Sequence, residues 1–339
     1  MSYITTNNIT SINAELTNYC NAACPMCARY YIDGKLVADK VNSKHTTLEF
    51  LQEKIGLDVV QRLWHFTSCG NFGDGAMNPE CVEIYRWLRE VNPNIILELY
   101  SNGGARNKEF WTAMAETGVE VTFAIDGMED TNHLYRRNVK WPKLMENVKA
   151  FISAGGKANW EMLIFKHNEN QIESCRKLSE SMGFFKFNSK QSARWADFDS
   201  EGKWRDLSEI KLDTYSLEKS TYMEAPGIGQ GGNSQKENTG SDKLKKAKIS
   251  CFAHQVKDNF VEIYLAANGD VSPCCWLGDL RMHESKNIIK DYTKVNLNHT
   301  ALDDILKGDY FMELEKGIRG DQDANRLHTC YFNCGIKDQ

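Results

Sequence analysis

The residues best suited to metal chemistry are three cysteines near the N-terminus, Cys20, Cys24 and Cys27. They share one short segment at the spacing C-x3-C-x2-C. Three soft thiolates on one loop suit a cuboidal iron–sulfur cluster that keeps one iron without a protein ligand. Zinc is the alternative, but a structural zinc takes four protein ligands, and the neighbouring sequence offers no fourth. The pattern therefore favours a cluster whose open iron binds another molecule.

A second group of cysteines lies near the C-terminus: Cys251, Cys274, Cys275, Cys330 and Cys334. Residues 261–272 predict a β-hairpin that turns at Asn268-Gly269-Asp270. Cys251 precedes this hairpin, Cys274 follows it, and the last two cysteines form a terminal pair. Four such thiolates can close around one metal centre, either a cluster or a zinc ion as in zinc ribbons. Cys275 is an alternative to Cys274 as a ligand.

The elements that must position these cysteines alternate along the chain. Strands are predicted over residues 9–17, 64–68, 95–100, 119–125, 159–165 and 184–187, with helical segments between them. Such alternation predicts parallel strands with right-handed crossovers. Six units are too few for the closed eight-unit barrel. The predicted fold class is therefore α/β, a partial (β/α)6 TIM-like barrel with a small C-terminal domain of a β-hairpin plus helices that binds a cluster.

Local signals predict where some elements begin and how the chain is divided. Thr46 to Glu49 is a capping-box pattern, and the apolar spacing from Leu48 to Leu63 predicts one helix. The core barrel is expected over 1–190, a linker over 191–250 and the cluster-binding domain over 251–339. Within the linker, residues 225–241 are almost all Gly, Asn, Gln, Ser and charged residues, which predicts a flexible loop.

The composition narrows the classes of protein that this chain can be. It has 339 residues, of which 41% are hydrophobic and 26% are charged. No apolar run reaches the ~18 residues that a membrane span needs, and the N-terminus lacks a signal-peptide pattern. We therefore expect a cytoplasmic protein, in which the 11 cysteines stay reduced and are free to bind metal. The net charge of −5 argues against general nucleic-acid binding.

The cysteine spacing after the first strand resembles the signature of the radical SAM enzymes, whose core is the same partial barrel. The resemblance implies a [4Fe-4S] cluster on Cys20, Cys24 and Cys27. Its open iron would chelate S-adenosylmethionine and, once reduced, cleave it to methionine and a 5′-deoxyadenosyl radical. The C-terminal cysteines resemble the auxiliary-cluster domains called SPASM and, in shortened form, twitch, because Gly269 and Cys274 match their Gly-x4-Cys element. This implies one auxiliary [4Fe-4S] cluster on Cys251, Cys274, Cys330 and Cys334.

The same resemblance implies contacts to S-adenosylmethionine at the C-terminal ends of the strands. The segment Gly73-Asp74-Gly75 stands where the family has a turn that holds the methionine amino group, and Ser101-Asn102 looks like the family's Thr-Asn. Asp126 lies in a motif similar to Ser-Leu-Asp-Gly. Arg136 stands where relatives carry an arginine for the carboxylate, which a guanidinium fork fits well. Met26, inside the cysteine loop, joins this set, and no catalytic acid or base is assigned. A capped turn for Asp126 and a surface charge for Arg136 are the alternatives.

The predicted function is oxidative modification of a peptide or protein by radical SAM chemistry. A small-molecule dehydrogenase of the same family is one alternative, and a non-catalytic iron–sulfur or zinc protein is another. The expected partners are the substrate and an external electron donor of the flavodoxin or ferredoxin type. No separate peptide-recognition domain is expected before the barrel, which counts against a peptide substrate, so the sequence leaves peptide and small molecule open.

Overall fold

The computed structural model describes most of the chain. The described residues are 4–37, 42–192, 195–201, 203–207, 209–211, 216–222, 248–255, 260–278, 285–321, 324 and 327–335. The segment 225–241, predicted as a flexible loop, lies outside the described residues.

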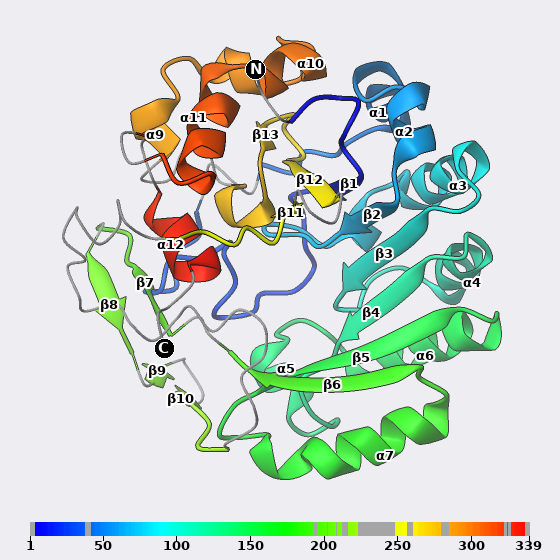
Figure 1. Cartoon of the computed structure of the whole chain (residues 1–339). Coiled ribbons are helices and arrows are strands. Elements are labelled where there is room, and N and C mark those ends of the chain that lie inside the picture. The colour runs from blue at the N-terminus through cyan, green and yellow to red at the C-terminus, as the bar shows by residue number, and fades with distance from the viewer. Residues whose placement is uncertain are drawn as a thin grey trace.

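A single large sheet forms the centre of the molecule (Figure 1). Six strands follow one another in space and in sequence, and all are parallel: β1 (Ser11–Ala14), β2 (His65–Ser68), β3 (Ile96–Ser101), β4 (Glu120–Ala124), β5 (Lys157–Ile164) and β6 (Lys186–Gln191). The predicted partial (β/α)6 barrel is confirmed. The carboxyl ends of these strands therefore share one edge, where ligands bind in such folds.

Helices cover one face of the sheet and leave the other open (Figure 1). The crossovers contain α3 (Cys81–Val91), α4 (Lys108–Glu116), α5 (Asn132–Tyr135), α6 (Trp141–Ser153) and α7 (Ile172–Met182), and the 3₁₀ segments η2 (Gly75–Met77) and η3 (Glu169–Gln171). In β3, Leu97 and Leu99 are buried, whereas the alternate residues Glu98 and Tyr100 are half-buried. The apolar side of each strand packs on the helices, so the inner side of the partial barrel is polar.

The helix expected from Leu48 to Leu63 is two helices, α1 (Leu48–Lys54) and α2 (Leu57–Arg62). Gly56 separates them with a φ of 82°, a conformation that suits glycine and ends a helix. The predicted capping box is also displaced by one residue. Thr47 is the N-cap, and its side chain accepts a hydrogen bond from the Phe50 amide. The apolar spacing persists across the break because both helices pack on the same core.

The C-terminal segment adds a strand to the main sheet. The predicted hairpin is confirmed as β12 (Phe260–Leu265) and β13 (Val271–Ser272), and β11 (His254–Gln255) also pairs with β12 in an antiparallel direction. Unexpectedly, β12 also pairs in parallel with β1. The remaining elements are η5 (Cys275–Leu277), α9 (Ser285–Ile288), η6 (Tyr292–Val295), α10 (Leu302–Leu306), α11 (Asp309–Ile318) and α12 (His328–Cys334). The strand that precedes the first cysteine loop thus lies directly beside the strand that leads to Cys274.

Two small hairpins follow β6, in the region expected to be a linker. They pair β7 (Ala196–Phe198) with β8 (Trp204–Asp206) and β9 (Glu209–Lys211) with β10 (Ser216–Glu218). Trp195 anchors the first of them, because it is buried and its ring lies 6.1 Å from that of Phe165 at the end of β5. This part of the chain therefore packs near the carboxyl end of the sheet.

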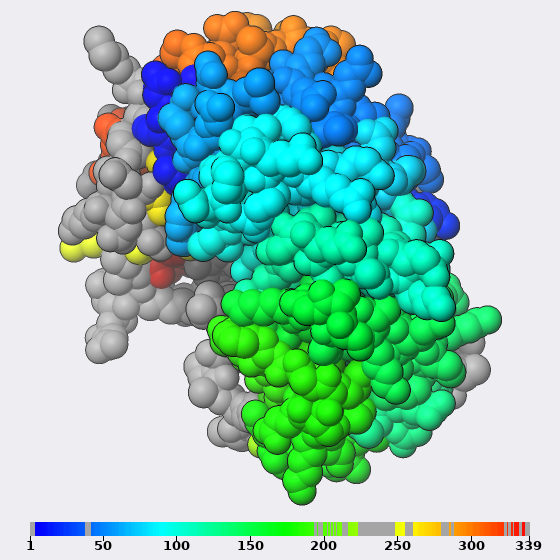
Figure 2. Space-filling view, turned by 90° about the vertical axis from the view of Figure 1, so that its right-hand side faces the viewer, coloured from blue at the N-terminus to red at the C-terminus, as the bar shows by residue number. Residues whose placement is uncertain are grey.

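The first described residues lie against the C-terminal segment. In Figure 2 the blue N-terminal residues contact the orange helices of the C-terminal segment. Thr6 donates a hydrogen bond to Asp303, at 3.2 Å, across this contact. Within the described residues, no helix has the length and apolar character needed to span a membrane.

Candidate active site and second cysteine site

The first cysteine loop leaves the carboxyl end of β1 and turns tightly back. The amide of Cys27 donates to the carbonyl of Cys24 at 3.1 Å, and the amide of Ala23 donates to the carbonyl of Arg137 at 3.0 Å. Cys24 is buried, whereas Cys20 and Cys27 are partly exposed. The loop therefore gathers its three thiols at the edge of the sheet where the other strand-end motifs lie.

The chemistry of these thiols fits a cationic metal centre. Burial raises the pKa of the Cys24 thiol to about 11, although the Arg136 guanidinium acts against the rise. Burial, and then the Asp74 carboxylate, raise the pKa of Cys20. The neighbouring thiols of the loop also raise the pKa of Cys20 and of Cys24. Iron reverses this preference, because thiolates bound to a metal are stabilised. In the part of the chain that the structure describes, no group of Cys, His, Asp or Glu forms a site for a single metal ion.

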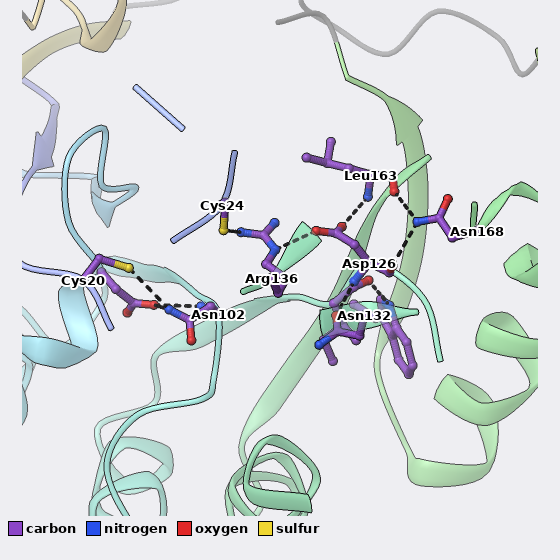
Figure 3. A network of polar contacts seen from close by, with 11 residues as sticks. Cys20, Cys24, Asn102, Asp126, Asn132, Arg136, Leu163 and Asn168 are labelled. Atoms are coloured by element: carbon purple, nitrogen blue, oxygen red, sulfur yellow. Dashed lines mark hydrogen bonds and ion pairs between the residues drawn. The ribbon is translucent and has the colours of Figure 1, made fainter. Parts of the chain in front are cut away.

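Asp74 and Asn102 form a buried network beside Cys20 (Figure 3). The Asp74 carboxylate accepts hydrogen bonds from the Ser101 hydroxyl at 3.0 Å, from the Asn102 amide at 2.8 Å and from the Asn102 side chain at 2.6 Å. The Asn102 side chain also lies 3.7 Å from the Cys20 sulfur and bonds Asn21 at 2.9 Å. Burial raises the pKa of Asp74 and these bonds lower it. Both residues thus hold the cysteine loop in place.

Arg136 connects the loop to the end of β4. Its Nε donates to Asp126 at 2.6 Å, and its Nη1 lies 3.7 Å from the Cys24 sulfur (Figure 3). The guanidinium is only 16% exposed. Burial raises the pKa of Asp126, and the positive charge of Arg136 opposes this. One edge of the guanidinium is therefore held by a fixed carboxylate, and the other points toward the cluster site, where an anionic group would be bound.

Asp126 itself is fully buried and its carboxylate is already occupied by protein groups. Besides Arg136, it accepts a hydrogen bond from the Leu163 amide at 2.6 Å. Asn132 and Asn168 bond the backbone amide and carbonyl of Asp126 (Figure 3). The sequence assigned Asp126 to direct cofactor contact, but these contacts suit a residue that orients Arg136. The two asparagines were missed because each is a lone polar residue without a recognisable pattern.

The remaining predicted cofactor residues also lie near the cysteine loop. A Cβ atom on Gly73 would collide with the Thr17 carbonyl oxygen, and one on Gly75 would lie 2.7 Å from the Ser68 hydroxyl. The turn thus packs directly against the chain that enters the cysteine loop. Met26 is buried, and its sulfur lies 3.8 Å from the Ser192 hydroxyl after β6. The structure therefore brings the predicted residues of strands one to four together at one edge.

Two buried charged residues beside this turn were missed by sequence reasoning. Glu15, directly after β1, accepts hydrogen bonds from the amides of Phe72 and Gly73. Arg29, directly after the cysteine loop, donates to the carbonyls of Asn18 and Phe72. The sequence did carry a signal for Glu15, because an acid that ends an otherwise apolar strand needs buried partners.

The second group of cysteines meets at one small cavity beside α11 and α12. Cys251, Cys274, Cys330 and Cys334 all line it, and most of the other lining is apolar. The thiols of Cys251 and Cys334 share a hydrogen bond, which raises the pKa of Cys251 and lowers that of Cys334. Four soft donors in an apolar enclosure fit a fully ligated cluster. His254 also lines the cavity and was not anticipated, and burial lowers its pKa to about 4.

Cys275 does not line this cavity. After burial, the largest influence that raises its pKa, to about 12, is Cys69 at the end of β2. Of the two alternatives, Cys274 is therefore the one placed with the other three cysteines. Cys81 and Cys175 lie buried in α3 and α7, away from both groups.

A larger cavity, of about 400 Å³, opens on the outer side of the first cysteine loop. Its lining includes Pro25, Tyr30, Arg137, Ile210 and Lys211, so it joins the loop to the hairpin of β9 and β10. It combines apolar surface with charged groups and has the size of ordinary ligand pockets.

Two family profiles match this chain. Residues 14–178 match the Radical SAM superfamily, and residues 257–335 match SPASM, an iron–sulfur cluster-binding domain. A search of curated proteins gives no match.

Solved structures share the fold. SuiB of Streptococcus suis bound to S-adenosylmethionine has a TM-score of 0.57 and 13% identity, over 92% of this chain and 68% of that chain. The protein anSMEcpe with bound AdoMet has a TM-score of 0.52 and 15% identity, over 89% and 78%. Its complex with AdoMet and the Cp18Cys peptide gives 0.52 and 13%, over 96% and 88%. These TM-scores show a common fold, and the two profiles imply [4Fe-4S] clusters. The chain belongs to the radical SAM superfamily and carries a C-terminal SPASM domain.

Proposed function

We propose that this chain is a radical SAM enzyme that oxidatively modifies a peptide or protein. The observation that carries the proposal is the meeting of three thiols with Arg136 and the Asp74–Asn102 network at one edge of the sheet. A reduced [4Fe-4S] cluster on Cys20, Cys24 and Cys27 supplies the electron that cleaves S-adenosylmethionine to methionine and a 5′-deoxyadenosyl radical. An electron carrier without this chemistry has no need of a buried arginine beside the cluster.

The residues of the chain bind and orient S-adenosylmethionine in this proposal. The outer edge of the Arg136 guanidinium pairs with the carboxylate, while Asp126 fixes its direction. The turn of residues 70–75 offers its backbone to the amino group. Met26 and Ser192 lie at the far side of the loop, where they enclose the cofactor and exclude water.

The polar inner side of the barrel is the proposed place for the substrate. Glu98 is 32% exposed and bonds His65, and Glu161 is 25% exposed and bonds Lys190 at 2.9 Å. These groups lie below the strand ends and face the open side of the sheet. They can hold polar groups of a substrate while its reacting carbon points upward to the cofactor.

Two observations support a peptide over a small molecule. Two similar solved structures contain peptides, SuiB with the precursor peptide SuiA and anSMEcpe with the Cp18Cys peptide. The cavity of about 400 Å³ beside the cysteine loop also offers both charged and apolar surface to a larger substrate. A small-molecule dehydrogenase remains the second candidate, favoured by the polar groups on the inner side of the barrel.

The second cluster, on Cys251, Cys274, Cys330 and Cys334, is proposed to accept the electron left after substrate oxidation. Its four thiols leave no position for a substrate, so transfer of electrons is the role that suits it. An external donor of the flavodoxin or ferredoxin type supplies the first electron. All 11 cysteines are free thiols, which supports work in the reducing cytoplasm.

The test is anaerobic reconstitution followed by a chromatographic assay for 5′-deoxyadenosine. The parent chain should produce it with dithionite and S-adenosylmethionine. Replacing Cys20, Cys24 and Cys27 by Ala should abolish the product and remove about half of the iron. If the triple variant still formed 5′-deoxyadenosine, the radical site would lie elsewhere. If the fully loaded parent formed no 5′-deoxyadenosine, the proposal that this chain is a radical SAM enzyme would be refuted.

The substrate class is decided by the same assay with host material. Extract from the native host is separated into peptide and small-molecule fractions, and each is added to the parent protein. A peptide fraction should stimulate 5′-deoxyadenosine formation. If only the small-molecule fraction stimulated the reaction, the peptide proposal would be wrong and the chain would be a small-molecule dehydrogenase.

A further inference from the structure

The turn of residues 70–75, called here the glycine turn, rests on a buried carboxylate. Glu15 is 1% exposed, and one of its oxygens accepts hydrogen bonds from the Phe72 amide and, at 3.0 Å, from the Gly73 amide. A carboxylate taken out of water is costly unless its oxygens are bonded. Glu15 and the glycine turn therefore hold each other in one arrangement.

The other oxygen of Glu15 is bonded from the C-terminal domain. It accepts a hydrogen bond from the Tyr264 hydroxyl at 2.9 Å, although the two residues are 249 positions apart in sequence. Tyr264 lies in β12 and is fully buried. Its ring is confined, because a Cβ atom on Gly278 would lie 2.5 Å from it. The hydroxyl is thus presented to Glu15 from a fixed position.

A second contact ties the same turn to the second cysteine site. The Asn71 side chain donates to the Cys275 carbonyl at 2.8 Å, one residue beyond Cys274. On its opposite side, the turn is bonded through Arg29 and packs against Thr17 where the first cysteine loop begins. The glycine turn is therefore the element that touches both cysteine sites.

We infer that Glu15 and Tyr264 are positioning residues for S-adenosylmethionine, and that the C-terminal domain sets the glycine turn through the Tyr264 hydroxyl. The inference rests on the proposed function, in which this turn binds the amino group of the cofactor. Neither residue touches the cofactor. Their effect is to hold the turn's backbone at the distance and direction that the amino group requires.

The hydrogen-bond pattern predicts a graded response to substitution. Glu15→Ala removes every bond, and Tyr264→Phe leaves one buried carboxylate oxygen without a partner. Glu15→Gln can keep the pattern, because its amide oxygen accepts from the two backbone amides and its NH2 group can donate to Tyr264. The pattern, not the negative charge, is therefore what must be preserved.

The experiment measures binding of labelled S-adenosylmethionine to the cluster-loaded full chain by anaerobic equilibrium dialysis. We expect affinity to fall about tenfold or more in Glu15→Ala and about three- to tenfold in Tyr264→Phe, the loss of one to several buried hydrogen bonds. Glu15→Gln should stay within about twofold. In Tyr264→Phe the KM for S-adenosylmethionine should rise while kcat for its cleavage stays within about twofold, because the reacting groups are untouched.

Two matched controls separate positioning from a general loss of stability. Tyr85→Phe removes an equally buried hydroxyl, which donates to the Glu98 carbonyl at 2.7 Å and not to the glycine turn. Glu262→Gln changes a buried carboxylate of the same strand β12 that bonds Ser11. Both should bind the cofactor within about twofold of the parent.

The outcomes distinguish this inference from the proposed function. If the loaded parent binds no S-adenosylmethionine, the proposed function fails and the inference falls with it. If the parent binds but Tyr264→Phe matches Tyr85→Phe, only the positioning role is overturned. It is also overturned if Glu15→Gln binds as weakly as Glu15→Ala. Should Glu15→Ala lose iron or fail to fold, Tyr264→Phe decides alone.

Discussion

Arg136 contacts both a cysteine thiol and a buried carboxylate of the site. Its Nε is held by Asp126 at 2.6 Å, and its Nη1 reaches to 3.7 Å from the Cys24 sulfur. The rigid fork of a guanidinium can bond a carboxylate on one edge and another anion on the next. The surface-charge alternative considered for Arg136 does not suit a side chain that is 16% exposed.

Replacement of Arg136 by lysine tests this geometry at constant charge. A lysine ammonium is a point donor and cannot serve Asp126 and a cofactor carboxylate with the same planar fork. We expect the affinity for S-adenosylmethionine to fall about 10- to 100-fold, which corresponds to the loss of one charged hydrogen bond. Equilibrium dialysis measures it. Arg137→Lys, at the exposed neighbouring residue, is the control and should stay within about twofold. Equal affinities for both variants would contradict the role of Arg136.

Glu15 predicts a pH dependence of stability. Burial raises its pKa to about 7, above the value near 4.3 of an unfolded glutamate. Between these values the folded chain binds more protons than the unfolded chain, so this group's contribution falls as pH rises, by up to about 1.4 kcal/mol per pH unit. We therefore expect the urea midpoint of the parent, measured from pH 5 to 8, to fall relative to that of Glu15→Gln as the pH rises. A constant difference would show that Glu15 is not the titrating group.

At the scale of elements, the ends of neighbouring strands are connected by the glycine turn, which packs closely between them. The glycine turn packs against the exit of β1, and the end of β3 is fastened to it through Asp74. Such close approach of two backbones requires residues without a Cβ atom. The glycines here are therefore a packing requirement and not simply a flexible loop.

Gly73→Ala tests this packing. The added Cβ atom would collide with the Thr17 carbonyl oxygen, so the turn must move away from the cysteine loop. We expect loss of measurable S-adenosylmethionine binding and a decrease in unfolding free energy of about 1–3 kcal/mol, typical of overpacking. Urea unfolding and dialysis measure the two effects.

Gly155→Ala is the matched control for that variant. Gly155 has a φ of 85°, and a Cβ atom there meets nothing within 4 Å. It should lose about 1 kcal/mol of stability through backbone strain and keep its affinity for S-adenosylmethionine. If both variants bind equally well, the close packing of Gly73 has no bearing on the site.

At the scale of the whole molecule, pairing of β12 with β1 brings the two cysteine sites onto one sheet. β1, which precedes the first cysteine loop, and β12, the first strand of the hairpin that precedes Cys274, are neighbours in register, with Ser11 opposite Glu262 and Ala14 opposite Leu265. The second site is thereby positioned by the same backbone as the first. Such an arrangement suits electron transfer between two fixed clusters.

Single cysteine variants test which residues hold the second cluster. Cys274→Ala removes a thiol from the cavity and should lower iron and sulfide content by about half. Cys275→Ala should keep the full content, because that side chain lies outside the cavity. Iron and sulfide analysis of the reconstituted proteins decides between them. The opposite result would make Cys275 the ligand.

Much of the fold could be predicted because its signals are local. The alternation of strands and helices, the 261–272 hairpin and helices such as α4 follow from spacing and turn residues in short windows. The misplaced capping box at Thr46 and the unseen break at Gly56 show the limit of such windows. Several residues compete to begin or end a helix, and packing selects one. The domain division at residues 190 and 250 stays a prediction.

The site was less predictable, because its supports come from distant parts of the chain. Cys20, Cys24 and Cys27 form a motif that can be recognised in isolation, the strand-end positions of Asp74 and Asn102 follow from the order of elements, and Arg136 was placed by the family resemblance. Their roles as ligands and cofactor contacts remain predictions.

The sequence by itself determined that three thiolates follow a first strand, that six parallel units build the edge around them, and that a second group of cysteines exists. Only the tertiary structure decided that Asp126 bonds Arg136, that Cys274 rather than Cys275 lies with the other three cysteines, and that Tyr264 bonds Glu15. The physical reason is that a motif consists of residues close together in sequence. A buried hydrogen bond, in contrast, can join residues far apart in sequence when the sheet places their strands side by side. No short stretch of sequence predicts the pairing of β12 with β1, and it is this pairing that brings Tyr264 to Glu15.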